Sequence, residues 1–100
     1  MQISYNIMIF TGLQDFTSKL NPYIVAETRA LYPNISGICD AFVSAQKGCN
    51  CSKKRRMELV ISVYKNMAER LIPEEKTWLK NLFGQEEIIF QENGQNFLVF

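Results

Sequence analysis

The segment IIFQENGQNFLVF, residues 88–100, decides the fold class because two apolar runs flank a strong turn signal. Asn-Gly is the dipeptide that two-residue hairpin turns prefer, since both of its residues tolerate a positive φ. A two-residue loop at this dipeptide would place Phe90 opposite Phe97. It would likewise place Ile88 opposite Val99. We therefore predict a β-hairpin whose two faces are both apolar.

Such a hairpin is marginal in water on its own, so it needs a third strand or a cover on each face. Residues 2–10 are the candidate strand, because β-branched and aromatic side chains alternate there with mostly polar ones. This period of two is typical of a half-buried strand, with Ile3, Tyr5, Ile7 and Ile9 on one side. We therefore expect a three-stranded antiparallel sheet. A helical N-terminus would instead give a mostly α domain.

Apolar residues at helical spacing predict four or five short helices between the outer segments. Together with the strands they predict one α+β domain over residues 1–100, with the helices packed on a small antiparallel sheet made of the N-terminal strand and the C-terminal hairpin. Capping residues, prolines and glycines mark the helix ends. The expected helices run from Leu13 to before Pro22, from Pro22 to before Pro33, from Ile38 to Gly48 after a turn at Asn34 to Gly37, from Ser52 to Leu71, and from Pro73 to Gly84.

The composition limits the classes of function. The chain has 100 residues, 47% of them apolar, and a formal net charge of +1, as in an ordinary globular protein. It contains no histidine, which excludes an imidazole general base, Ser-His-Asp and Cys-His arrangements, and metal sites that need an imidazole ligand. The apolar start is too short for a bilayer span and lacks the cations of a signal peptide. We therefore expect a non-enzymatic intracellular protein without a cofactor or a membrane contact.

The three cysteines, Cys39, Cys49 and Cys51, are an odd number in a chain without a secretion signal, so free thiols are expected. Cys49 and Cys51 form a Cys-x-Cys pair beside four cations, which favour the thiolate form. A structural zinc site needs four ligands, however, and the chain offers too few. We therefore expect no bound metal, the alternative being a site that a second copy completes. The same pair supplies the only candidate nucleophiles if the chain is an enzyme.

The run GCNCSKKRR, residues 48–56, leads from this thiol-bearing loop into four consecutive cations. If Ser52 caps the next helix, the cations fill its first turn, where the helix dipole is already positive. Each such charge costs about 0.3–1 kcal/mol at low salt, so a sequence selected only for stability would carry acids there. Free backbone N–H groups and cationic side chains together suit an anion. The predicted anion-binding residues are Ser52, Lys53, Lys54, Arg55 and Arg56.

The alternative interpretation of these cations is a solvated basic face, with the helix starting nearer Met57. If the run binds nucleic acid, its contacts should go to phosphates without sequence preference, because a helix end offers no base-reading register.

The C-terminal run supplies a second candidate surface, because an apolar strand can extend a partner's sheet or enter a partner's pocket. The sequence thus favours a non-enzymatic structural or interaction protein with a protein partner or a homo-oligomer. The alternative function is a small module that binds nucleic acid, or another polyanion, through Lys53 to Arg56. The predicted partner-binding residues are Phe97, Leu98, Val99 and Phe100.

The Gly-Cys-x-Cys sequence and Lys/Arg run at residues 48–56, followed by a helix containing Tyr64, resemble a pattern in small uncharacterised proteins of tailed bacteriophages, especially marine ones. The resemblance covers about a fifth of the chain. It implies a viral origin, a virion or accessory role, and a location in the host cytoplasm or the virion. It assigns no role to any residue.

Overall fold

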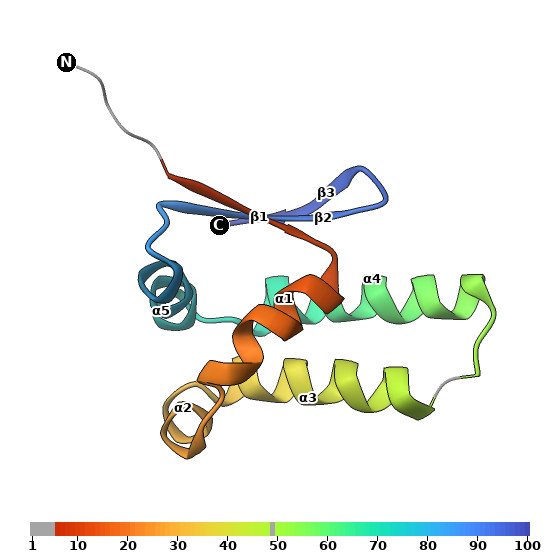
Figure 1. The fold of residues 1–100 in the computed structure, drawn as a ribbon, viewed down its shortest axis with the longest axis horizontal. Coiled ribbons are helices and arrows are strands. Elements are labelled where there is room, and N and C mark those ends of the chain that lie inside the picture. Colours follow the sequence, from red (N-terminus) through yellow and green to blue (C-terminus); the bar gives the residue numbers. More distant parts are fainter. Residues whose placement is uncertain (1–5, 49) are drawn as a thin grey trace.

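The computed structural model describes residues 6–48 and 50–100. It confirms an α+β fold in which helices pack on a three-stranded sheet (Figure 1). Residues 2–5 of the predicted first strand lie outside the described residues. The elements in chain order are β1 (Ile7–Thr11), α1 (Leu13–Leu20), the 3-10 turn η1 (Asn21–Tyr23), α2 (Ala26–Leu31), α3 (Pro33–Gly48), α4 (Lys53–Arg70), α5 (Pro73–Phe83), β2 (Glu87–Glu92) and β3 (Gln95–Val99).

The sheet is mixed rather than antiparallel. Its strand order is β1-β2-β3, with β2 antiparallel to β3 but parallel to β1. The prediction of a wholly antiparallel sheet is therefore wrong for β1. A parallel pair needs a long crossover, and the five helices between β1 and β2 supply one that returns the chain to the end of the sheet where β1 began. Both parallel strands consequently end at the same edge of the sheet.

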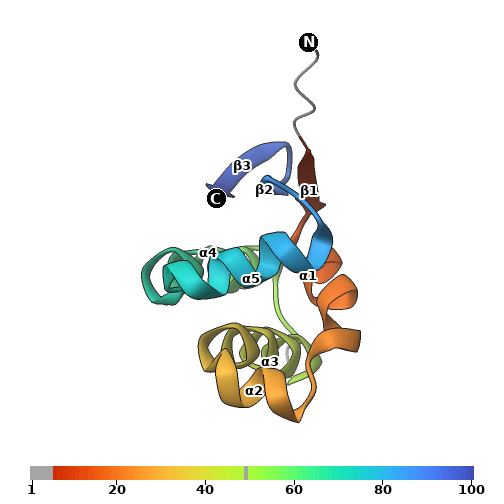
Figure 2. The same ribbon diagram turned by 90° about the vertical axis from the view of Figure 1, so that its left-hand side faces the viewer.

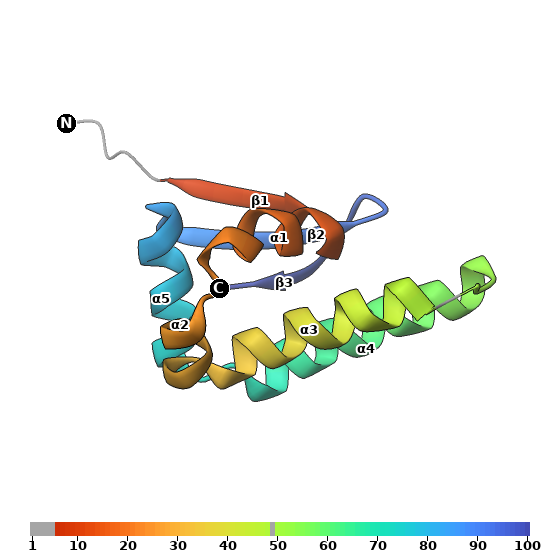
Figure 3. The ribbon, with the colours of Figure 1, turned by 60° about the horizontal axis from the view of Figure 1, so that its bottom comes forward.

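All the described helices lie on one side of the sheet (Figures 1 and 2). Figure 2 shows the sheet above α1, α4 and α5, with α2 and α3 forming the layer farthest from it. The long helices α3 and α4 run side by side (Figure 3). The core lies between the sheet and the helices, where Phe90 contacts Phe10 at 5.2 Å and Phe16 at 5.0 Å between ring centroids.

On the opposite face of the sheet, several aliphatic side chains are exposed among the described residues. Ile7 and Ile9 are 46% and 44% exposed, whereas Phe10 on the other face of β1 is fully buried. The sequence prediction for β1 therefore chose the wrong face. Alternation alone marks two faces but does not say which one the helices cover. The contacts of Phe10 with Phe16 and Phe90 in the core turn its face of β1 toward the helices. Ile9 pairs with Ile89 and Ile89 pairs with Val99, so three aliphatic side chains form a row across the open face.

The hairpin forms at the predicted turn, with φ of 52° at Asn93 and 77° at Gly94. Next to the turn, Glu92 pairs with Gln95 and Gln91 pairs with Asn96, as a two-residue loop requires, but the register shifts beyond these two pairs. A bulge after Phe90 leaves Phe97 unpaired and sets Phe90 opposite Leu98. The predicted pairs of Phe90 with Phe97 and of Ile88 with Val99 are therefore wrong. The bulge directs the Phe97 ring onto Tyr64 on α4, where the rings stack at 4.8 Å.

The boundary between α2 and α3 also differs from the prediction. Helix α2 begins at Ala26 rather than Pro22, and Pro33 starts α3 instead of stopping a helix. The residues predicted as a turn, 34–37, are the first turn of α3.

The buried Glu75 carboxylate explains this early start of α3. It accepts hydrogen bonds from Asn34 Nδ2 at 2.8 Å and from the Ile35 N–H at 3.0 Å. It thus satisfies donors at a helix start that would otherwise lack partners. A cap supplied from 40 residues away has no local sequence signal.

Locally marked boundaries agree with the prediction. Helix α3 ends at Gly48, α5 begins at Pro73, and Gly84 adopts the left-handed conformation that ends α5. Across residues 6–48 and 50–100, no helix combines the length and the apolar character needed to cross a membrane.

Candidate anion-binding site

Helix α4 begins where the sequence places it. The Ser52 hydroxyl accepts a hydrogen bond from the Arg55 N–H at 3.4 Å, and Lys53 is the first helical residue. All four cations, Lys53 to Arg56, therefore lie in the first turn and are exposed. The alternative, a helix that starts near Met57, is wrong. We call residues 52–56 the cationic turn.

No residue of the cationic turn forms an ion pair with another described residue. Its helix carries no acid in the first turn. The two ion pairs found among residues 6–48 and 50–100 are Lys19 with Asp15 and Arg29 with Asp40, both away from α4. Four positive charges thus add to the positive end of a helix dipole without an ion pair among the described residues.

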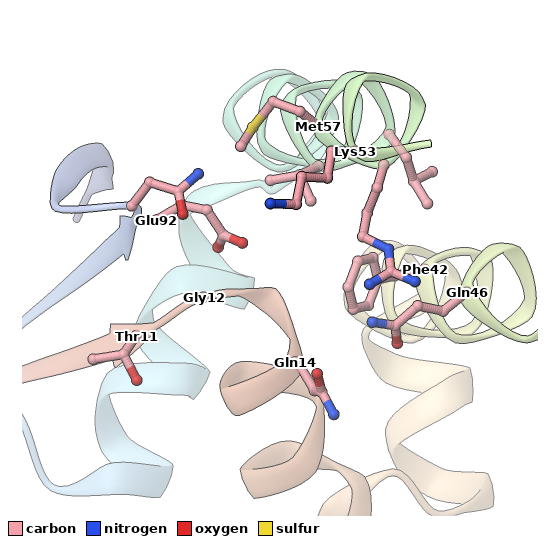
Figure 4. Close-up of a pocket in the computed structure, with 12 residues that line it drawn as sticks. Thr11, Gly12, Gln14, Phe42, Gln46, Lys53, Met57 and Glu92 are labelled. Atoms are coloured by element: carbon pink, nitrogen blue, oxygen red, sulfur yellow. The ribbon is translucent and has the colours of Figure 1, made fainter. Parts of the chain in front are cut away.

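A cavity of about 570 Å³ lies beside the cationic turn (Figure 4). It is enclosed by the β1–α1 connection, α3, the first turns of α4 and the hairpin end. Lys53 and Arg56 line it, whereas Lys54 and Arg55 do not. Of the five predicted anion-binding residues, two therefore border the cavity, while Ser52, Lys54 and Arg55 are exposed outside it.

The cavity lies beyond the carboxyl ends of the two parallel strands. Thr11, the last residue of β1, and Glu92, the last residue of β2, both line it. Helix α1 starts next to the cavity, and its N-cap Gly12 provides no side-chain cap.

Gly12 and Glu92 are site residues that the sequence did not identify. Gly12 has φ 106° and ψ 164°, a conformation that is essentially restricted to glycine. A Cβ atom at Gly12 would lie 2.9 Å from Glu92 Oε2. The only sequence signal was a glycine between a strand and a helix, because the contact with Glu92 joins distant segments.

Tyr64 fixes the Glu92 carboxylate from the other side. Its buried phenol donates a hydrogen bond to Glu92 Oε2 at 3.2 Å. Burial, and then the nearby carboxylate, raise the pKa of Tyr64 well above its usual value. Tyr64 belongs to the core, and it positions an acidic side chain on the wall of the cavity.

The cysteines divide between a disulfide and a buried thiol. Cys51 is disulfide-bonded, so the expectation of free thiols is wrong for it, and its sulfur is not available as a metal-binding thiolate. Cys39 is a free, buried thiol, and burial raises its pKa to about 12. Cys49 lies outside the described residues. The described residues contain no group of three or more side chains that could hold a metal ion.

The C-terminal candidate residues mostly pack against their own chain. Phe97 stacks on Tyr64, and Phe100 lies 5.6 Å from Phe90 between ring centroids. Leu98 is half-buried, whereas Val99 is 51% exposed on the open face of the sheet. Of this run, Val99 is therefore the residue most accessible to a partner.

Comparisons with protein-family models, curated proteins and solved structures found no match to this chain. The function must therefore be inferred from the residues and geometry of the molecule itself.

Proposed function

We propose that this chain is a non-enzymatic interaction protein that binds an anionic partner at the cationic turn. The observation that carries the proposal is the position of Lys53 to Arg56 in a first helical turn without an ion pair among the described residues. An anion bound there would relieve the repulsion between these charges and accept hydrogen bonds from their side chains.

A nucleic-acid backbone is one such partner. Lysine, arginine and helix N-termini are regular ligands of phosphate groups. Binding through phosphates alone would show little preference for base sequence. An acidic protein surface offers carboxylates to the same turn, so both kinds of partner belong in the test.

The test compares two charge-matched variants in fluorescence anisotropy titrations at low salt. The probes are a labelled single-stranded oligonucleotide of mixed sequence and a labelled polyglutamate peptide. One variant replaces the four cations Lys53 to Arg56 with Gln. The control replaces four cations elsewhere on α4 and α5, namely Lys65, Arg70, Lys76 and Lys80.

We expect the first variant to lose at least about tenfold in affinity for whichever probe binds, the effect of losing charge-assisted hydrogen bonds. The control variant should change affinity by less than about threefold, because charges outside the site act only through a screened field. Equal losses in the two variants, or no binding of either probe to the native protein, would overturn the proposal.

Assembly through the open face of the sheet is a second candidate function. Ile7, Ile9 and Val99 are about half exposed there, and Ile89 lies between the last two. We propose a second copy of this chain as the occupant, because an aliphatic row across three strands can pack against its own two-fold copy without charge matching. A subunit role of this kind agrees with the resemblance to small phage proteins.

Native mass spectrometry over a range of protein concentrations tests this assembly. Ile9→Gln combined with Val99→Gln should shift the protein to a monomer. Val25→Gln combined with Leu31→Gln, two exposed apolar residues at α2, should leave the oligomer intact. A native protein that is monomeric at every concentration excludes self-assembly through this face.

A further inference from the structure

We propose that the cavity beside the cationic turn binds a nucleoside monophosphate, with the phosphate at Lys53 and Arg56 and the sugar hydroxyls at Glu92. The inference rests on the proposed anion binding for its two cations. It goes beyond that function by naming a small ligand and by adding residues from three other parts of the fold.

The size and walls of the cavity fit a small molecule. Its volume of about 570 Å³ lies within the range of known ligand sites, about 300 to 1,000 Å³. Phe42, Leu59 and Val60 supply apolar lining from the two long helices. Gln14 and Gln46 add amide groups that can both donate and accept hydrogen bonds. A flat base has both an apolar surface and polar edges to match this lining.

Lys53 and Glu92 face one another across the cavity without forming an ion pair. Lys53 reaches into the space from α4, and Glu92 reaches into it from the hairpin (Figure 4). Neither Lys53 nor Arg56 forms an ion pair with Glu92. A ligand that carries an anion at one end and hydroxyl donors at the other would satisfy both walls. Inorganic phosphate would use only the cationic wall and would be repelled by the carboxylate.

The Glu92 carboxylate is held in position before any ligand arrives. Tyr64 donates a hydrogen bond to Oε2, and the absence of a side chain at Gly12 leaves room for the same oxygen. Gly12 has a sparsely populated backbone conformation at the point where its backbone lies next to the Glu92 carboxylate. A carboxylate fixed in this way can accept hydroxyl hydrogen bonds without first losing conformational freedom.

Isothermal titration calorimetry on the full chain tests the proposal with adenosine monophosphate, guanosine monophosphate, adenosine and inorganic phosphate. We expect a mononucleotide to bind at least about tenfold more tightly than adenosine or phosphate alone, because it engages both walls. No mononucleotide binding, or binding no tighter than that of phosphate, would overturn the proposal.

Two pairs of substitutions in the same helical turn locate the ligand. Lys53→Gln with Arg56→Gln should weaken mononucleotide binding by at least about tenfold. Lys54→Gln with Arg55→Gln, which removes two charges outside the cavity, should change it by less than about threefold. Equal losses from the two pairs would place the anion on the outer surface and exclude the cavity.

Glu92→Gln provides a readout that a purely structural role would not give. Removing the carboxylate should raise the affinity for phosphate and lower the affinity for the mononucleotide. The ratio of mononucleotide affinity to phosphate affinity should therefore fall by about fivefold or more. An unchanged ratio would exclude Glu92 as the hydroxyl acceptor.

The same variants separate the two proposals. Suppose that the oligonucleotide binds the native protein, that the two double variants weaken this binding equally, and that no mononucleotide binds. The proposed function then stands and the cavity proposal fails. If neither kind of probe binds the native protein, both proposals fail.

Discussion

At the scale of single residues, Gly12 combines a backbone conformation that favours glycine with a close approach to the Glu92 side chain. Gly12→Ala should destabilise the protein by about 1–3 kcal/mol, because alanine strains the backbone and its Cβ collides with Glu92. Gly37→Ala is the control, since Gly37 lies within α3 with open space around it. It should stabilise the protein by up to about 1 kcal/mol through helix propensity. Urea unfolding measures both, and a neutral Gly12→Ala would contradict the described geometry.

Burial of Tyr64, together with the Glu92 carboxylate beside it, gives the stability of the protein a pH dependence. Because the pKa of Tyr64 is raised, the folded protein keeps the phenol proton where the unfolded chain, with a pKa of 10.0, loses it. The stabilisation is therefore complete below about pH 10 and is lost as the pH rises further.

Urea unfolding of the native protein and of Tyr64→Phe, between about pH 8 and pH 11, measures this contribution. We expect the stability difference between the two proteins to shrink as the pH rises. A difference that stays constant over this range would mean that the phenol has its ordinary pKa.

At the scale of elements, Glu75 connects the start of α3 to the start of α5. Glu75→Ala leaves the Ile35 N–H and the Asn34 amide without their acceptor in a buried position. We expect a loss of about 2–3 kcal/mol in the free energy of unfolding, the cost of buried polar groups without partners. The neighbouring Glu74 is exposed, so Glu74→Ala should change stability by less than about 0.5 kcal/mol. Similar values for the two variants would exclude the capping role.

Elements with local end signals could be predicted from the sequence. The cap at Ser52, the first-turn proline Pro73, the αL residue Gly84 and the Asn93-Gly94 turn all act through their own backbone neighbours. The start of α3 could not be predicted, because this helix receives its cap from a residue 40 positions away. The hairpin bulge likewise depends on a tertiary contact, the stacking of Phe97 on Tyr64.

At the scale of the whole molecule, the direction of β1 determines the candidate site. If β1 ran antiparallel to β2, the end of β1 would lie near the start of β2. The parallel pairing instead sets Thr11 opposite Gln91 and brings Gly12 against Glu92. The sequence therefore predicted the cations of the site but missed its acidic wall. A helix start with a local cap, such as the one at Ser52, can be predicted from the sequence, whereas strand direction follows from how the helices pack as a layer.

If the cationic turn binds an anion through its own charges, the affinity must fall as the salt concentration rises. We would measure the affinity for the single-stranded oligonucleotide at several salt concentrations, for the native protein and for the variant with Gln at residues 53–56. Each neutralised phosphate contributes a slope of about −0.7 in a plot of log affinity against log salt, so three or four contacts predict about −2 to −3. The variant should have a slope near zero. A flat native plot, or an equally steep slope in the variant, would contradict the account.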